Sequence, residues 1–150
     1  MERNDPKSRY YARTMHTPDD AARAEFRAAL RDLSRTLIPL HRALIEAAKS
    51  DYAFAHGPVG NPSHLLNLLQ SDPFFEWLKP VTALIVDIDE MARKDFEQAD
   101  AKGIAARAER LFGSGGEGAF GEKYVPILQR NVDVAAGHAA IRRLLSRLQS

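Results

Sequence analysis

Apolar residues recur at spacings of three and four along most of the chain, which is the periodicity of an amphipathic α-helix. The first such pattern covers residues 18–53, where Thr17 can cap a helix and Pro18 suits its first turn. Its apolar stripe consists of Phe26, Leu30, Leu33, Leu37, Leu40, Leu44 and Ala48. Pro39 lies inside the pattern, and because proline lacks a backbone donor, we expect it to kink or split this helix.

Two further helix starts are marked by a proline that follows an Asn or Asp, since such a side chain can cap a helix whose first residue is proline. Asn61 and Pro62 begin a short, leucine-rich helix. Asp72 and Pro73 begin a third helix that we expect to continue to about residue 98. The apolar residues of this third helix cover more than half of its circumference, which predicts a central position in the fold.

The remaining periodic segments predict a short connecting helix over residues 101–112 and a long final helix over residues 119–149. The run ALIVDI, residues 83–88, could form a strand by composition, but no second segment has the pattern of a strand that could pair with it. We therefore expect an all-α fold, a four-helix-bundle-like single domain with an extra short helix.

Length and composition agree with one globular domain. The 150 residues are 45% hydrophobic and 27% charged, and a chain of this length can bury one sizeable core. We expect the domain to comprise residues 17–150. Residues 1–16 are polar and are expected to form a flexible N-terminal arm, whose Tyr10 and Tyr11 could contact the domain or a partner.

The sequence contains no cysteine, which excludes disulfides, zinc–thiolate sites, iron–sulfur clusters and cysteine nucleophiles. Its apolar stretches are shorter than the ~20 residues that span a membrane. The first residues lack the apolar centre of a secretory signal. We therefore expect a cytoplasmic protein with no membrane partner.

The net charge of +1 conceals an uneven distribution, because residues 51–100 carry nine acidic and three basic side chains and basic residues are in excess on both sides. Two charged rows stand out, Arg23, Arg27, Arg31 and Arg35 on the first predicted helix and Asp87, Glu90 and Glu97 on the third. Solvated faces with some pairing inside the chain explain these rows, and the alternative is contact with another subunit, another protein or nucleic acid. Nucleic acid is disfavoured, because the chain is near neutral and no aromatic residues lie among the arginines.

No motif in the sequence indicates an enzyme. Residues 116–121 match the dinucleotide pattern GxGxxG, but the strand that must precede it is not predicted. The P-loop, the metal motifs HExxH and ExxH, and the nucleophile elbow GxSxG do not occur in the sequence. These observations favour a protein that is not an enzyme.

Four polar side chains fall within apolar arcs when residues are placed at about 100° per position. They are His41 on the first predicted helix, Asp89 on the third, and Asn131 and His138 on the last. Because burying such groups unpaired costs about 1–3 kcal/mol each, we expect them to find partners. An internal hydrogen-bond network is one explanation, and partial exposure at a helix end or subunit interface is another.

A third explanation is a functional site, in which His41, Asp89 and His138 bind a metal ion or line a small-molecule pocket. Two imidazoles and one carboxylate suit zinc or iron with an open coordination position. Outside this alternative, we expect no cofactor.

An aromatic group, Phe74, Phe75 and Trp77, lies at the start of the third predicted helix. Such a group commonly closes the end of a bundle core. It could instead form the mouth of a ligand pocket or the anchor of a partner contact, since Trp and Phe are frequent at interface centres.

These patterns together predict a non-enzymatic interaction or accessory protein that acts as a homo-oligomer, in the simplest case a homodimer. The reasons are the missing catalytic motifs, the surplus of aliphatic faces and the segregated charge. The alternative is a metal- or small-ligand-binding bundle centred on His41, Asp89 and His138.

Overall fold

The protein is described here by a computed structural model that covers residues 18–113 and 118–149. Its elements are α2 (Pro18–His56), α3 (Pro62–Ser71), the 3₁₀ helix η1 (Pro73–Leu78), α4 (Lys79–Ala92), α5 (Gln98–Phe112), α6 (Gly118–Arg130) and α7 (Val132–Gln149). These residues contain no β-strand, so the all-α prediction is confirmed. The predicted arm, residues 1–16, and the glycine-rich residues 114–117 lie outside the described part of the chain.

Both helix starts predicted from an Asx–Pro pair are confirmed, and their caps have the expected geometry. The backbone N–H of His64 donates to Oδ1 of Asn61 at 2.8 Å at the start of α3. The backbone N–H of Phe74 donates to Oδ1 of Asp72 at 2.9 Å at the start of η1. Each cap side chain thus satisfies a backbone donor that the first helical turn leaves without a partner.

Other predicted boundaries are wrong. The third predicted helix begins as a 3₁₀ helix and its α-helical part ends at Ala92, after which residues 93–97 connect to α5. The last predicted helix is divided at Asn131 into α6 and α7. Pro39 was expected to kink or split the first helix, and the split does not occur, since α2 is one helix on both sides of Pro39. The Pro39 side chain is exposed, so its ring does not disturb the core face of the helix.

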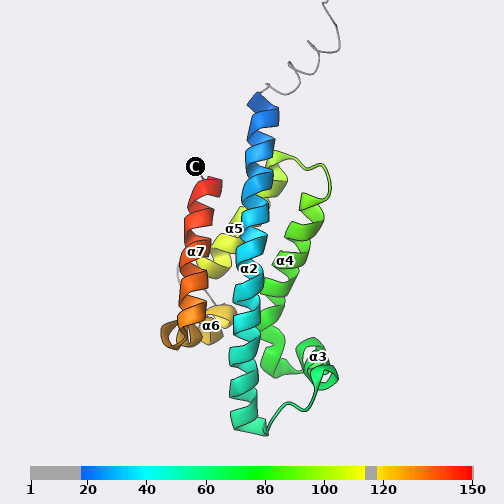
Figure 1. Ribbon diagram of the computed structural model, residues 1–150, viewed down its shortest axis with the longest axis vertical. Helices are drawn as coiled ribbons and strands as arrows, with labels where there is room; N and C mark the ends of the chain where they lie inside the picture. The colour runs from blue at the N-terminus through cyan, green and yellow to red at the C-terminus, as the bar shows by residue number, and fades with distance from the viewer. Residues whose placement is uncertain (1–17, 114–117, 150) are drawn as a thin grey trace, which may run out of the picture.

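The long helix α2 organises the molecule (Figure 1). It packs against α7 on one side and α4 on the other, while α5 contacts both α4 and α7. At the end of α2 that includes His56, α3 and η1 pack on each other and η1 also contacts α6. Figure 1 shows α3 at the lower end of the molecule and the connection between α4 and α5 near the opposite end.

The core follows the predicted stripe of α2. Leu30, Leu33, Leu37, Leu40 and Leu44 are fully buried, and they belong to one cluster with buried residues of α4, α5, α6 and α7. The largest other fully buried side chains are Phe75, Phe112 and Tyr124. None of the described helices has both the length and the apolar character that crossing a membrane requires.

Candidate functional site

The predicted site residue His41 lies on the edge of the core stripe of α2 and is half-buried. Its Nε2 is 2.8 Å from the hydroxyl of Thr82 on α4, and that hydroxyl is also within 3.3 Å of the carbonyl oxygen of Leu78. Burial lowers the pKa of His41 from its ordinary value, because removal from water disfavours the charged imidazolium. His41 therefore links α2 to α4 through an uncharged hydrogen bond.

His138 is half-buried on α7, and its Nδ1 lies 2.8 Å from the hydroxyl of Tyr124 on α6. Burial lowers the pKa of His138, and the positive charge of Arg142 lowers it further. Tyr124 is fully buried, and this burial raises the pKa of its phenol. The pair is therefore neutral, and its hydrogen bond gives the buried hydroxyl a partner.

Asp89 does not point into the core, so its predicted inward orientation is wrong. Its side chain is 53% exposed and forms an ion pair at 2.7 Å with Arg93, the residue that follows the end of α4. Asp89 was predicted to face inward because its direction is close to those of Leu78, Ile85 and Phe96 when all are placed on one helix. Leu78 belongs to η1 and Phe96 to the connection after α4, so neither follows the 100° spacing of α4. Ile85 does lie in α4, but it is itself only half-buried.

Asn131 was predicted as a buried polar residue within a long helix, and the structure assigns it another role. Its Oδ1 accepts a hydrogen bond of 3.1 Å from the backbone N–H of Val134, so it caps the start of α7 and is only half-buried. Asn is among the residues that favour this position, because its side chain competes with the helical backbone.

His41, Asp89 and His138 therefore have separate partners on the residues described, and the structure does not unite them in one site. Within residues 18–113 and 118–149, no three His, Asp or Glu side chains are grouped so that they could hold a metal ion. The zinc or iron alternative thus lacks the juxtaposition of ligands on which it depended.

The aromatic group at residues 74–77 closes the end of the core. Phe75 is fully buried, so it offers no surface to a partner. Phe74 is half-buried and stands edge-on to Tyr52 with ring centroids 5.4 Å apart. Trp77 is half-buried against Phe120 of α6 at 5.9 Å. These contacts support the core explanation for all three predicted residues.

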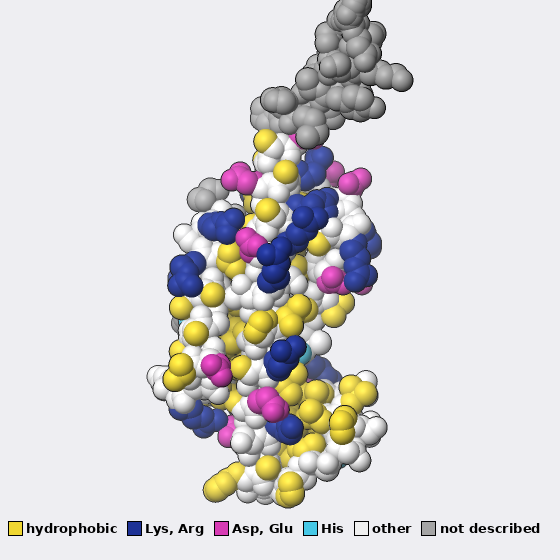
Figure 2. All heavy atoms as spheres, in the orientation of Figure 1, with side chains coloured by type: hydrophobic (Ala, Val, Ile, Leu, Met, Phe, Trp, Pro, Cys, Tyr) yellow, Lys and Arg dark blue, Asp and Glu magenta, His cyan; other side chains and the backbone are white. Residues whose placement is uncertain are grey.

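Two of the exposed large apolar side chains lie at this end of the molecule, whereas Ile38, Val86 and Val132 are exposed elsewhere. Phe54, in the last turn of α2, is 95% exposed, and Leu66 of α3 is 54% exposed. Residues 52–71 contain no Asp, Glu, Lys or Arg, and we refer to this segment as the uncharged end. Figure 2 shows hydrophobic and uncharged side chains at the lower end of the molecule, whereas charged side chains are spread over the parts above it.

Local hydrogen bonds hold the uncharged end in shape. Gly57 follows α2 with φ of 95°, a left-handed conformation that glycine adopts without strain. The backbone N–H of Gly60 donates to Nδ1 of His64 at 2.9 Å, which fixes the loop to the first turn of α3. The rings of Tyr52 and His56, one turn apart, are in tilted contact with centroids 4.9 Å apart. The exposed Phe54 thus stands on an ordered support.

The absence of charged residues from positions 52–71 could have been recognised in the sequence, but it is hidden when charges are counted over each third of the chain. The exposure of Phe54 could not be predicted from the sequence, because it depends on where α3 and η1 pack. Comparisons with protein-family models, with curated proteins and with solved structures find no match to this chain.

Proposed function

We propose that the protein is a non-enzymatic interaction protein that acts as a homodimer, and that two copies meet through the uncharged end. The observation that carries the proposal is Phe54, which is 95% exposed in a segment without charged residues. Burying a phenylalanine side chain contributes about 1.5–3 kcal/mol relative to leaving it in water. Contact centres between proteins are depleted in charge and enriched in aromatic residues, which is the composition of this surface.

A second copy of the chain fits this surface better than a charged partner does. A two-fold axis places the same patch on both sides of an interface, so any charge on the patch would face its own copy. The uncharged end avoids that repulsion. Phe54 and Leu66 would supply apolar area on each side, and the polar side chains of the loop and α3 would form the rim.

The charged rows support the choice of the uncharged end, because many of their members have partners inside the chain. Arg107 of α5 pairs with Asp87 at 2.6 Å, and Arg35 pairs with Asp32 at 3.5 Å. Glu97 and Asp100 form a capping box at the start of α5. These contacts agree with solvated faces that pair internally.

Arg27 has the most specific role among the arginines. Its guanidinium donates to the carbonyl oxygens of Ala92 at 2.6 Å and Lys94 at 3.2 Å, and it lies 5.0 Å from the centroid of the Phe96 ring. These bonds join α2 to the end of α4. Arg27 is therefore explained by the fold and is not needed for a partner.

The proposal is tested by sedimentation equilibrium of the full chain and of Phe54→Asp. We expect the wild type to dimerise at micromolar concentration and Phe54→Asp to weaken dimerisation by at least about 100-fold, since an unpaired charge would be buried at the contact centre. The matched control is Val132→Asp, which places the same charge on an apolar side chain that is 83% exposed outside the uncharged end.

Val132→Asp is expected to dimerise as the wild type does. Circular dichroism of all three proteins separates loss of dimer from loss of fold. A wild type that stays monomeric at high micromolar concentration contradicts the proposal. Equal weakening by the two variants contradicts the assignment of the interface to the uncharged end.

A further inference from the structure

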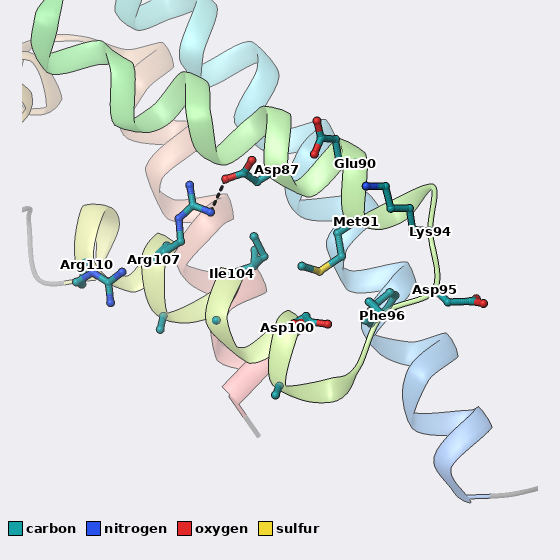
Figure 3. Close-up of a pocket in the computed structure, with 13 residues that line it drawn as sticks. Asp87, Glu90, Met91, Lys94, Asp95, Phe96, Asp100, Ile104, Arg107 and Arg110 are labelled. Carbon is teal, nitrogen blue, oxygen red and sulfur yellow. Dashed lines mark hydrogen bonds and ion pairs between the residues drawn. The ribbon is translucent and has the colours of Figure 1, made fainter.

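A groove of about 650 Å³ lies between α4 and α5, on a different part of the molecule from the uncharged end (Figure 3). Met91 of α4 and Ile104 of α5 contribute apolar atoms to it, and Phe96 lies at the end formed by the connection between the two helices. The groove is open to solvent.

Small side chains on α5 leave this groove open. Ala99, Gly103 and Ala106 line it and are exposed, and they recur at helical spacing along one side of α5. Gly103 lies inside the helix, where glycine costs roughly 0.5–1 kcal/mol relative to alanine. A Cβ atom at Gly103 would meet no atom within 4 Å, so packing does not require glycine there.

At Gly137, unlike Gly103, the packing of the helices does favour glycine. A Cβ atom at Gly137 would lie 3.2 Å from a side-chain atom of Leu40, because α7 approaches α2 closely at that point. Gly103 has no such neighbour and no left-handed backbone conformation. Departures from local helix preference without a structural reason are expected at functional sites.

The two ends of the groove differ in charge. Glu90, Asp95 and Asp100 lie at the end next to the connection between α4 and α5, where Lys94 is the basic residue among them. Arg110 lies at the other end. Between the two ends, Arg107 is paired with Asp87 at 2.6 Å. A segment that binds along the groove must therefore be basic at one end and acidic at the other.

The acidic end of the groove lies beside the first part of α2, because Arg27 bonds to the backbone of Ala92 and Lys94. Pro18, the first residue of α2, precedes Arg27 by nine residues, or about 13 Å of helix. The 17 residues before Pro18 can span up to about 55 Å when extended. The 15 residues of α5 span only about 22 Å. The N-terminal residues are thus long enough to reach the groove and follow it.

We propose that residues 1–17 bind in the groove between α4 and α5 of their own chain. Lys7, Arg9 and Arg13 are close to Pro18 in sequence and match the acidic end of the groove. Glu2 and Asp5 are farther from Pro18, with Arg3 between them, and would reach the end that carries Arg110. The net charge thus changes from +3 over residues 7–13 to −1 over residues 2–5, which is the direction that the groove requires.

The aromatic pair Tyr10 and Tyr11 would supply the apolar contact in this arrangement, because in the sequence it lies among the basic residues that match the end of the groove with Met91 and Phe96. The space above Gly103 then has a use, since a tyrosine ring needs room that a larger residue at position 103 would fill. The inference does not depend on the proposed dimer, which involves the opposite end of α2.

The experiment uses the full chain, which has no cysteine of its own. A nitroxide spin label attached to Ala12→Cys broadens the NMR signals of nuclei that come close to it. We expect the Met91 methyl signal and the Gly103 and Ile104 amide signals to lose more than half of their intensity relative to the reduced label. The same label in a Gly103→Trp background, which fills the groove, is expected to restore the Met91 methyl and Ile104 amide signals.

Gly103→Ala is the matched control, because it changes the same position but leaves the groove open, and it is expected to keep the broadening. Three outcomes overturn the proposal: full intensity at all three groove signals, broadening that persists in Gly103→Trp, and broadening confined to another surface. A mixture of spin-labelled chains with isotope-labelled chains gives the fourth test. Broadening of the groove signals in that mixture would show that a second copy supplies the segment, which overturns binding within one chain.

Discussion

The hydroxyl of Tyr124 lies 2.8 Å from Nδ1 of His138, so a fully buried phenol on α6 is bonded to a half-buried imidazole on α7. The ring of Phe112 stands edge-on to Tyr124 with centroids 5.5 Å apart and covers the pair from α5. The hydrogen bond therefore connects α6 to α7 across the break at Asn131 and satisfies a hydroxyl that the core would otherwise leave without a partner.

Substitution of Tyr124 and substitution of His138 are expected to lower the free energy of unfolding by different amounts. Tyr124→Phe deletes the buried hydroxyl and should lower the free energy of unfolding by about 0.5–1.5 kcal/mol. His138→Leu leaves that hydroxyl buried without this partner and should cost more, about 1–3 kcal/mol. In the double variant the costs should be less than additive, because both substitutions remove one interaction. Urea unfolding measures all three, and strictly additive costs would show that the contact contributes nothing.

Acid is expected to destabilise the protein through its two half-buried histidines. Burial lowers the pKa of both His41 and His138 in the folded state, whereas in the unfolded chain histidine titrates near ~6.5. Between that value and the lower folded pKa, the unfolded state binds more protons, so the free energy of unfolding falls as the pH falls. Below the folded pKa the histidine contribution to this slope ends.

The variant His41→Gln/His138→Gln tests this assignment. Urea unfolding as a function of pH should show a shallower dependence in the double variant than in the wild type over the range just below ~6.5. The two single variants should each remove part of the slope. A double variant with the slope of the wild type would assign the acid sensitivity to other groups.

Arg27 is expected to stabilise the junction between α2 and the end of α4. Arg27→Ala removes two bonds to backbone carbonyls and the contact with the Phe96 ring, and should cost about 1–3 kcal/mol. Arg27→Lys should recover only part of this, because an ammonium group cannot reproduce the planar fork of guanidinium donors. Arg31, which is exposed one turn later, is the matched control, and Arg31→Ala should change stability by less than about 0.5 kcal/mol. Thermal and urea unfolding give the comparison, which fails if the two alanine variants are equally stable.

The two helix glycines are expected to respond in opposite directions to alanine. Gly103→Ala should raise the free energy of unfolding by about 0.5–1 kcal/mol, because it lowers the conformational entropy of the unfolded chain and meets no neighbour. Gly137→Ala should lower it by about 1 kcal/mol, since the new Cβ would press on Leu40 in the core. Unfolding of both variants under the same conditions provides the measurement. A destabilised Gly103→Ala would mean that glycine is needed for the fold at that position.

The helical regions could be predicted from the sequence to the extent that single apolar stripes and caps define them. The stripe of α2 is regular over many turns, and its leucines are buried as predicted. Asn61 and Asp72 act through local bonds to the next few residues, so their capping did not depend on the rest of the fold. The division of the last predicted helix at Asn131 was missed, because apolar residues continue on both sides of it.

The candidate site was predicted less well, because orientation on a helical wheel is sensitive to where the helix begins and ends. Asp89 was placed inward by reference to Leu78 and Phe96, which lie outside α4, and to Ile85, which lies in α4 but is only half-buried. His41 and His138 lie at the edges of their stripes, where a small change in angle decides between burial and exposure. Their partners Thr82 and Tyr124 are distant in sequence or on another helix, and periodicity carries no information about such pairs.

By itself, the sequence determined that this chain forms helices, where the first ones start and which side of α2 faces inward, because these properties depend on residues within a few turns of each other. Only the tertiary structure decided that Phe54 stays in water, that Asp89 turns outward and that a groove remains between α4 and α5. Those outcomes depend on how close separate helices approach and at which height they meet. Distances of that kind arise from the packing of all the core side chains together, so no single segment encodes them.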